Sequence, residues 1–141
     1  MKKQLLFILL FSIYSVFSQD SVKIANLITQ SAESLKRNDV SKALQLAHQS
    51  FSISNQKSYN KGTVVAQNQL GYIFESQSNY DSANFYLAKS IDIAQKHNLK
   101  NEEAIAHNLI GLILWHQSKY KEALPHHTTS LNLFKETNNP K

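Results

Sequence analysis

Histidine has the widest chemical repertoire of the residues in this sequence, because imidazole binds metals and transfers protons near neutral pH. The six histidines are His48, His97, His107, His116, His126 and His127. A helical zinc site needs ligands on one face, commonly one turn apart. His107 and His116, nine residues apart, fall on opposite faces of a helix, and neighbouring His126 and His127 diverge by about 100°. We therefore predict no metal site and no other cofactor.

The sequence also lacks the motifs of common catalytic sites. It has no cysteine, which excludes thiol catalysis, disulfides and Cys-ligated zinc. It contains no nucleophile motif, no phosphate-binding loop and no paired acids in a pocket pattern. We therefore predict that the chain is not an enzyme.

The N-terminal residues 1–18 have the pattern of a secretory signal peptide. Lys2 and Lys3 precede an apolar core of thirteen residues from Leu5 to Phe17, and the small residues Val16 and Ser18 predict cleavage before Gln19. The core is shorter than the roughly 18–20 residues of a membrane span. We predict a periplasmic or extracellular protein, free of the membrane after cleavage. The alternative is an uncleaved N-terminal anchor in the inner membrane.

The positive charge is modest and dispersed. The whole chain has a formal charge of +5, and loss of Lys2 and Lys3 leaves 13 basic against 10 acidic residues. Nucleic-acid binding usually requires basic residues concentrated in one stripe, and none is present. We predict no nucleic-acid partner.

The chain repeats itself at an offset of forty residues. Ten residues of the middle third recur identically in the last: Ala66, Asn68, Gly71, Ile73, Gln77, Ser78, Tyr80, Ala83, Ser90 and Asn98. A diverged earlier copy keeps Ala43 and Ser50 at the positions of Ala83 and Ser90. A fixed period of this length is typical of repeat architectures. We therefore divide residues 19–141 into repeats at about 21–60, 61–100 and 101–141.

Each repeat has the pattern of two helices. Apolar residues recur at three- and four-residue steps, as in amphipathic helices. Short polar turns separate the two helices of a repeat, which favours an antiparallel pair. We predict an all-α fold of three helical hairpins and no strand. The predicted helices are 20–37, 41–55, 61–77, 80–96, 101–117 and 120–136, with Asn101 as a helix cap.

The recurring small and apolar residues are predicted to pack the hairpins together. Glycine inside a helix costs about 1 kcal/mol relative to alanine, so Gly71 and Gly111 indicate close helix approach, expected to be toward Ala83 and Ala123. The full predicted packing set is Leu70, Gly71, Phe74, Tyr80, Ala83, Leu87, Gly111, Leu114, Tyr120 and Ala123.

These residues resemble the tetratricopeptide repeat. Leu70-Gly71-x-x-Phe74 with Ala83 and Leu87 follows that family's pattern, and Ile110-Gly111-x-x-Leu114 follows it in part. The chain departs from the pattern in having no first aromatic residue, no late proline, and a period of forty rather than about 34 residues. The resemblance implies a right-handed α-solenoid that binds other polypeptides.

The same resemblance implies a concave groove lined by the first helix of each hairpin. The predicted groove residues are Val65, Asn68, Tyr72, Glu75, Ile105, Asn108, Leu112 and Trp115, echoed upstream by Ala25, Ile28, Ala32 and Leu35. The two asparagines either bond an extended ligand's backbone or satisfy local polar contacts. Trp115 either anchors a ligand or packs on its neighbouring helix. Apolar Ile28 and Ile105 argue against a groove that grips a chain-terminal carboxylate.

The sequence therefore predicts an exported helical-repeat scaffold that binds a protein or peptide. The alternative is the extracytoplasmic sensing segment of a longer bacterial signalling protein, a membrane histidine kinase or a helix-turn-helix regulator, which the reading frame beyond Lys141 would reveal. Leu131, Leu133 and Phe134 leave the C-terminal edge apolar. Such an edge predicts further repeats or self-association.

Overall fold

The computed structural model describes the backbone of residues 2–138 and the side chains of residues 19–138. Six helices make up this part of the chain: α1 (Lys2–Lys36), α2 (Val40–Gln56), α3 (Asn60–Ser76), α4 (Tyr80–Lys96), α5 (Lys100–His116) and α6 (Tyr120–Asn138). No strand occurs among residues 2–138. The predicted all-α class is confirmed, and the predicted bounds of α2 to α5 are within one residue of those observed.

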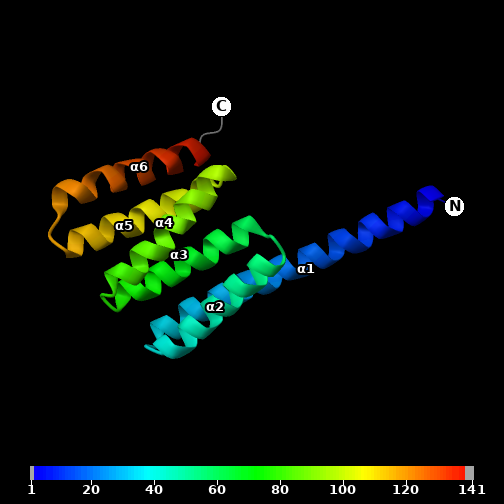
Figure 1. Cartoon of the computed structure of the whole chain (residues 1–141), viewed down its shortest axis with the longest axis horizontal. Coiled ribbons are helices and arrows are strands. Elements are labelled where there is room, and N and C mark those ends of the chain that lie inside the picture. Colours follow the sequence, from blue (N-terminus) through cyan, green and yellow to red (C-terminus); the bar gives the residue numbers. More distant parts are fainter. Residues whose placement is uncertain (1, 139–141) are drawn as a thin grey trace.

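The first helix is longer than predicted. The sequence predicts its start at residue 20, whereas the helical backbone begins at Lys2 and extends beyond the other helices (Figure 1). The side chains of residues 1–18 lie outside the described residues, so the signal peptide and its cleavage before Gln19 stay predictions. Within the described part of the chain, no helix is both long and apolar enough to cross a membrane.

The five turns between the helices share one geometry. Each contains one residue with positive φ, namely Asn38, Ser58, Ser78, Asn98 and Ser118. The amide of the following residue donates to a carbonyl five residues back, as Asn79 N does to Phe74 O at 2.9 Å. This bond satisfies a carbonyl at the helix end. The short turns hold consecutive helices antiparallel.

In each of the first two hairpins, the second helix has a side-chain cap at its N-terminus. Asp39 Oδ1 accepts from Lys42 N at 3.0 Å, and Asn79 Oδ1 accepts from Ser82 N at 3.2 Å. The predicted Asn101 cap is wrong, because α5 already begins at Lys100 and its capping residue, Leu99, makes no side-chain cap bond. The acidic side chains of Glu102 and Glu103 do lie in the first turn, where the helix dipole favours negative charge.

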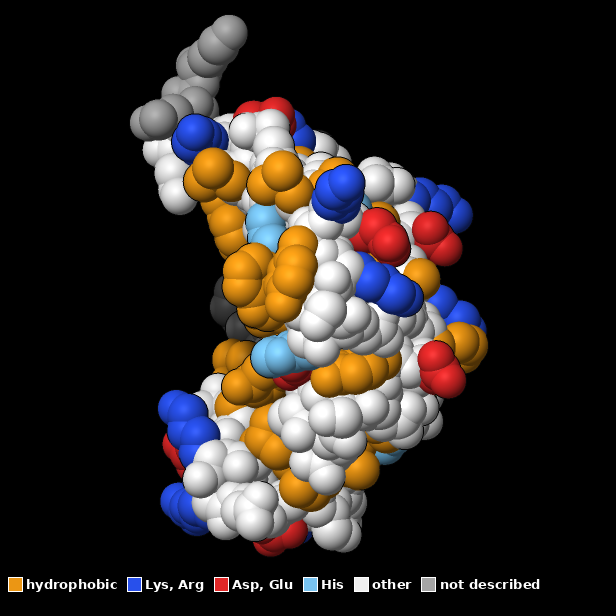
Figure 2. All heavy atoms as spheres, turned by 90° about the vertical axis from the view of Figure 1, so that its left-hand side faces the viewer, with side chains coloured by type: hydrophobic (Ala, Val, Ile, Leu, Met, Phe, Trp, Pro, Cys, Tyr) orange, Lys and Arg blue, Asp and Glu red, His pale blue; other side chains and the backbone are white. Residues whose placement is uncertain are grey.

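The helices form three adjacent hairpins arranged in two layers (Figure 1). Consecutive helices contact each other throughout, and the first helices α1, α3 and α5 also contact their neighbours in that layer. Over the described residues, the backbones of α2, α4 and α6 lie farther apart, although the His48 ring of α2 meets the Tyr86 ring of α4 edge-on at a centroid distance of 6.2 Å. A stack whose helices lie closer together in one layer than in the other is curved. Figure 2 shows a hollowed edge with hydrophobic side chains gathered along it.

Two buried clusters join successive hairpins. Ala43 and Ala47 of α2 pack with Leu70 and Ile73 of α3. The second cluster joins α4 to α5 and consists of Ala83, Leu87, Ala106, Leu109 and Ile113. In the predicted packing set, Leu70, Gly71, Ala83, Leu87, Gly111 and Ala123 are buried, Phe74, Tyr80 and Leu114 are half-buried, and Tyr120 is exposed.

The glycines do lie against the second helix of their hairpin, but not against the predicted alanines. A Cβ added to Gly71 would lie 2.6 Å from side-chain atoms of Leu87, and one added to Gly111 would lie 2.7 Å from the His127 ring. The opposing residue is thus one helical turn beyond Ala83 or Ala123. Large side chains fill the space that each glycine leaves.

Candidate functional site

The face of the first-helix layer contains an apolar hollow of about 310 Å³, which we call the anchor hollow. It is lined by Ile28 of α1, by Val65, Asn68, Gln69 and Tyr72 of α3, and by Ile105 and Leu109 of α5. Four of the eight predicted groove residues therefore meet at one place: Val65, Asn68, Tyr72 and Ile105. The repeat offset identified them because α3 and α5 are equivalent helices that lie side by side.

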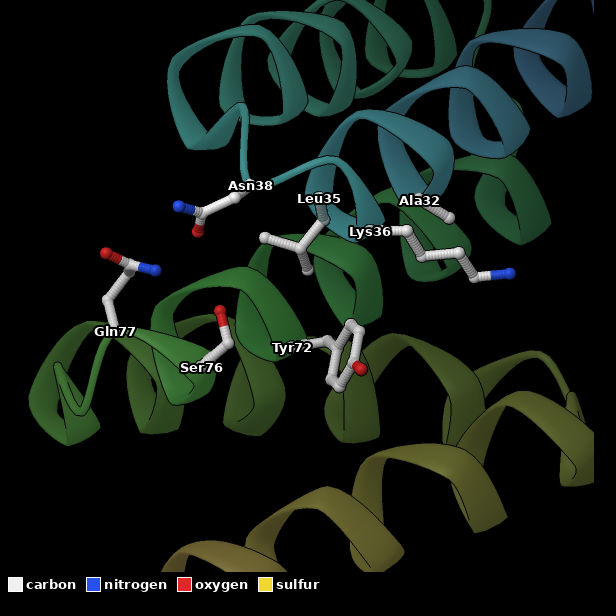
Figure 3. Close-up of a pocket in the computed structure, with 7 residues that line it drawn as sticks. All are labelled: Ala32, Leu35, Lys36, Asn38, Tyr72, Ser76 and Gln77. Atoms are coloured by element: carbon white, nitrogen blue, oxygen red, sulfur yellow. The ribbon is translucent and has the colours of Figure 1, made fainter.

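A second hollow of about 300 Å³ adjoins the first at the turn end of the hairpins, and we call it the polar hollow. Its lining residues are Ala32, Leu35, Lys36, Asn38, Tyr72, Ser76 and Gln77 (Figure 3). Tyr72 belongs to both hollows. The four polar residues of the polar hollow were not predicted from the sequence, because they lie at helix ends and turns, outside the stripe that helical periodicity selects.

Asn68 has a structural role inside the protein. Its side chain is buried, its Nδ2 donates to the Glu102 carbonyl at 2.9 Å, and its Oδ1 accepts from Ser90 Oγ at 2.5 Å. The amide thus links α3, α4 and α5. Asn108, its equivalent, is exposed, and its Oδ1 lies 3.1 Å from His127 Nδ1. Of the two predicted roles of Asn68, the geometry favours a local polar contact over a hydrogen bond to a ligand.

The other predicted groove residues lie toward the C-terminal ends of α3 and α5. Glu75 Oε1 is 3.2 Å from His116 Nε2, and only 11% of the Glu75 side chain is exposed. Trp115 is exposed, and its ring meets Tyr120 edge-on at a centroid distance of 4.7 Å. Leu112 is half-buried against the second core cluster. These residues do not line either hollow.

A pair of histidines that was not predicted from the sequence meets across α5 and α6. His107 Nδ1 and His126 Nδ1 are 3.0 Å apart. Burial lowers the pKa of both rings, Glu103 partly opposes this effect at His107, and His107 and His127 lower the pKa of His126 further. One nitrogen must donate and the other accept, so the observed pair requires at least one neutral ring. Helical spacing relates only histidines on the same helix, so it does not indicate this pair.

The described residues contain no group of three or more side chains suited to hold a metal ion. Near the histidine pair lies the Glu103 carboxylate, whose Oε1 is 3.9 Å from His107 Nε2. That carboxylate already accepts a bond from Gln95 Nε2 at 2.9 Å.

Comparison of the chain with protein-family models, with curated proteins and with solved structures gave no match.

Proposed function

We propose that this chain is an exported α-solenoid of the tetratricopeptide-repeat type whose concave groove binds an apolar segment of a protein or peptide. The resemblance at Leu70-Gly71-x-x-Phe74 supports the family assignment. The recurring turn geometry and the contacts of α1 with α3 and of α3 with α5 support a solenoid. Export rests on the N-terminal sequence pattern alone.

The observation that carries the binding proposal is the pair of exposed apolar side chains at the anchor hollow. Tyr72 and Ile105 are each 43% exposed and lie on neighbouring helices at its wall. Large apolar side chains grouped at a concavity favour binding, whereas single ones scattered over a surface do not. A volume of about 310 Å³ suits one or two apolar side chains of a polypeptide.

Random-peptide display on the purified chain tests this proposal. Selected peptides are synthesised, and their affinities are measured by fluorescence anisotropy. We expect Ile105→Asp to weaken binding at least about tenfold, because it places a charge in the apolar contact. The matched control is Phe85→Asp on α4, a residue that is also exposed but lines neither hollow. Equal affinities for wild type and Ile105→Asp would exclude the groove as the site.

A further inference from the structure

The concave face has two adjoining hollows of different chemistry, separated by Tyr72. The anchor hollow is lined mainly by apolar side chains, whereas the polar hollow combines Leu35 with an ammonium, two amides and a hydroxyl. We propose that the bound segment carries an acidic side chain close to its apolar anchor, and that the polar hollow receives the acid. This inference rests on the proposed function and specifies its ligand.

Charge is the first argument for an acidic group. The two hollows have thirteen lining residues, because each has seven and Tyr72 is common to both. Lys36 is the single charged residue among them. A carboxylate placed here would meet a cation and no anion of the lining.

The acids nearest in sequence to the polar hollow have other partners. Asp39 accepts from Lys42 N at 3.0 Å, Glu33 pairs with Arg37 at 4.0 Å, and Glu75 is held by His116 at 3.2 Å. Among the described residues, no carboxylate forms an ion pair with Lys36. The Lys36 ammonium therefore retains its capacity for an external acceptor.

The two amide side chains of the hollow add hydrogen-bond donors. Asn38 and Gln77 point toward each other across one end of it, while the Lys36 side chain extends toward the opposite end, away from both amides (Figure 3). Ser76 Oγ donates to the Ile73 carbonyl at 2.7 Å, which leaves its oxygen as an acceptor only. The Lys36 ammonium favours an anionic oxygen, because hydrogen bonds between charged groups are stronger than neutral ones.

An extended peptide matches the order of the two hollows. Alternate side chains of an extended chain point to the same side, so an apolar residue and an acid two positions away can enter adjoining hollows. We assign the carboxylate to a side chain rather than to a chain terminus, because both hollows are open and a peptide can continue past them.

Anisotropy measurements on synthetic nonapeptides, acetylated and amidated, test the inference. Position 4 is Leu, Ile, Val, Phe or Tyr, position 6 is Asp, Asn or Lys, and all other positions are Gly or Ser. We expect Asp peptides to bind about threefold to fivefold more tightly than Asn peptides, with Lys peptides weakest, a difference suited to an exposed ion pair. The difference should shrink as salt rises.

Two lysine variants test whether the preference for Asp peptides arises in the polar hollow. Lys36→Gln should abolish the preference for Asp over Asn, so that the two peptide series bind with equal affinity. Lys42→Gln, an exposed lysine of α2 that lines neither hollow, should preserve the preference. A preference that survives Lys36→Gln would overturn the inference.

The remaining outcomes separate this inference from the proposed function. Equal binding of Asp, Asn and Lys peptides, lost in Ile105→Asp, would overturn the acidic specificity and leave the groove intact. No binding by any peptide, in this set or by display, would overturn the proposed function itself. The last measurement uses a truncated peptide that ends in a free carboxylate after position 5. Tighter binding of that peptide than of the Asp series would assign the hollow to a chain terminus and refute the side-chain proposal.

Discussion

Gly71 and Leu87 are matched in size across the middle hairpin. A Cβ on Gly71 would lie 2.6 Å from Leu87 Cγ. Forty residues earlier the same two positions hold Ser31 and Ala47, both buried, and Ser31 Oγ donates to the Ala43 carbonyl at 2.8 Å. The first hairpin therefore has a larger residue on its first helix and a smaller one on its second. The glycine–leucine pair and the serine–alanine pair therefore fill the space between the two helices of a hairpin in different ways.

This complementarity predicts the energetic coupling of the two positions. Gly71→Ser should destabilise the chain by about 1–3 kcal/mol through overcrowding, and Leu87→Ala by about 2–5 kcal/mol through a cavity. The double variant, which reproduces the pair of the first hairpin, should lose at least about 1 kcal/mol less than the sum. Urea denaturation of the four proteins measures the coupling. Additive losses would show that the two side chains do not share one space.

Acidification should destabilise the third hairpin through His107 and His126. Burial lowers both pKa values from the ordinary 6.5, so the unfolded chain binds protons at these rings more readily than the folded chain. The free energy of unfolding is then unaffected by them well above pH 6.5 and falls as pH drops below about 6.5. Thermal unfolding from pH 8 to pH 5 measures the fall.

The first hairpin supplies the matched variant for this experiment. Leu27 and Leu46 are the buried equivalents of His107 and His126. His107→Leu with His126→Leu should therefore fold and reduce the acid-induced drop in Tm. His97→Gln, an exposed histidine on another turn, controls for titration elsewhere. An identical pH profile for the double variant and the wild type would exclude the histidine pair as the cause.

Asn68 and Asn108 are expected to differ in their effect on stability. Asn68→Ala would leave the Glu102 carbonyl and the Ser90 hydroxyl without their buried partner, at a cost of about 1–3 kcal/mol. Asn108→Ala removes an exposed contact with His127 and should cost less than about 1 kcal/mol. Chemical denaturation of the two variants checks the order. Equal losses would contradict the role assigned to Asn68.

The repeat offset and the polar turns were enough to predict six helices and most of their bounds. The remaining features of the fold depend on contacts between helices. Helical spacing indicates that Gly71 faces a neighbour, but only the stagger of α3 against α4 makes that neighbour Leu87 rather than Ala83. The Asn101 cap pattern also misplaced the start of α5 by one residue, because α5 begins at Lys100 and its capping residue Leu99 makes no side-chain cap bond.

The candidate site was predicted in part for the same reason. Val65, Tyr72 and Ile105 follow a regular stripe along equivalent helices, so the sequence indicates their common surface. Lys36 and Gln77 reach the polar hollow from helix ends, where the chain direction changes and the stripe no longer applies. Nineteen residues separate His107 from His126, and their contact depends on how α5 packs against α6.

Export predicts a defined N-terminus. The small residues Val16 and Ser18 precede the expected cleavage site, so the secreted chain should begin at Gln19. Mass spectrometry of protein recovered from the periplasm or medium measures this directly. An intact Met1 in that material would instead support the N-terminal anchor.

The outer face of α6 should support self-association. Leu124 and Leu131 are 66% and 53% exposed. Their equivalents in the first hairpin, Leu44 and Phe51, are half-buried against the cluster that joins α2 to α3. Exposed apolar surface of this kind favours association, so the chain should form dimers or larger species below about 100 μM in sedimentation experiments. Leu124→Glu with Leu131→Glu should restore the monomer without loss of helix content, whereas a wild-type chain that is monomeric at that concentration would refute the prediction.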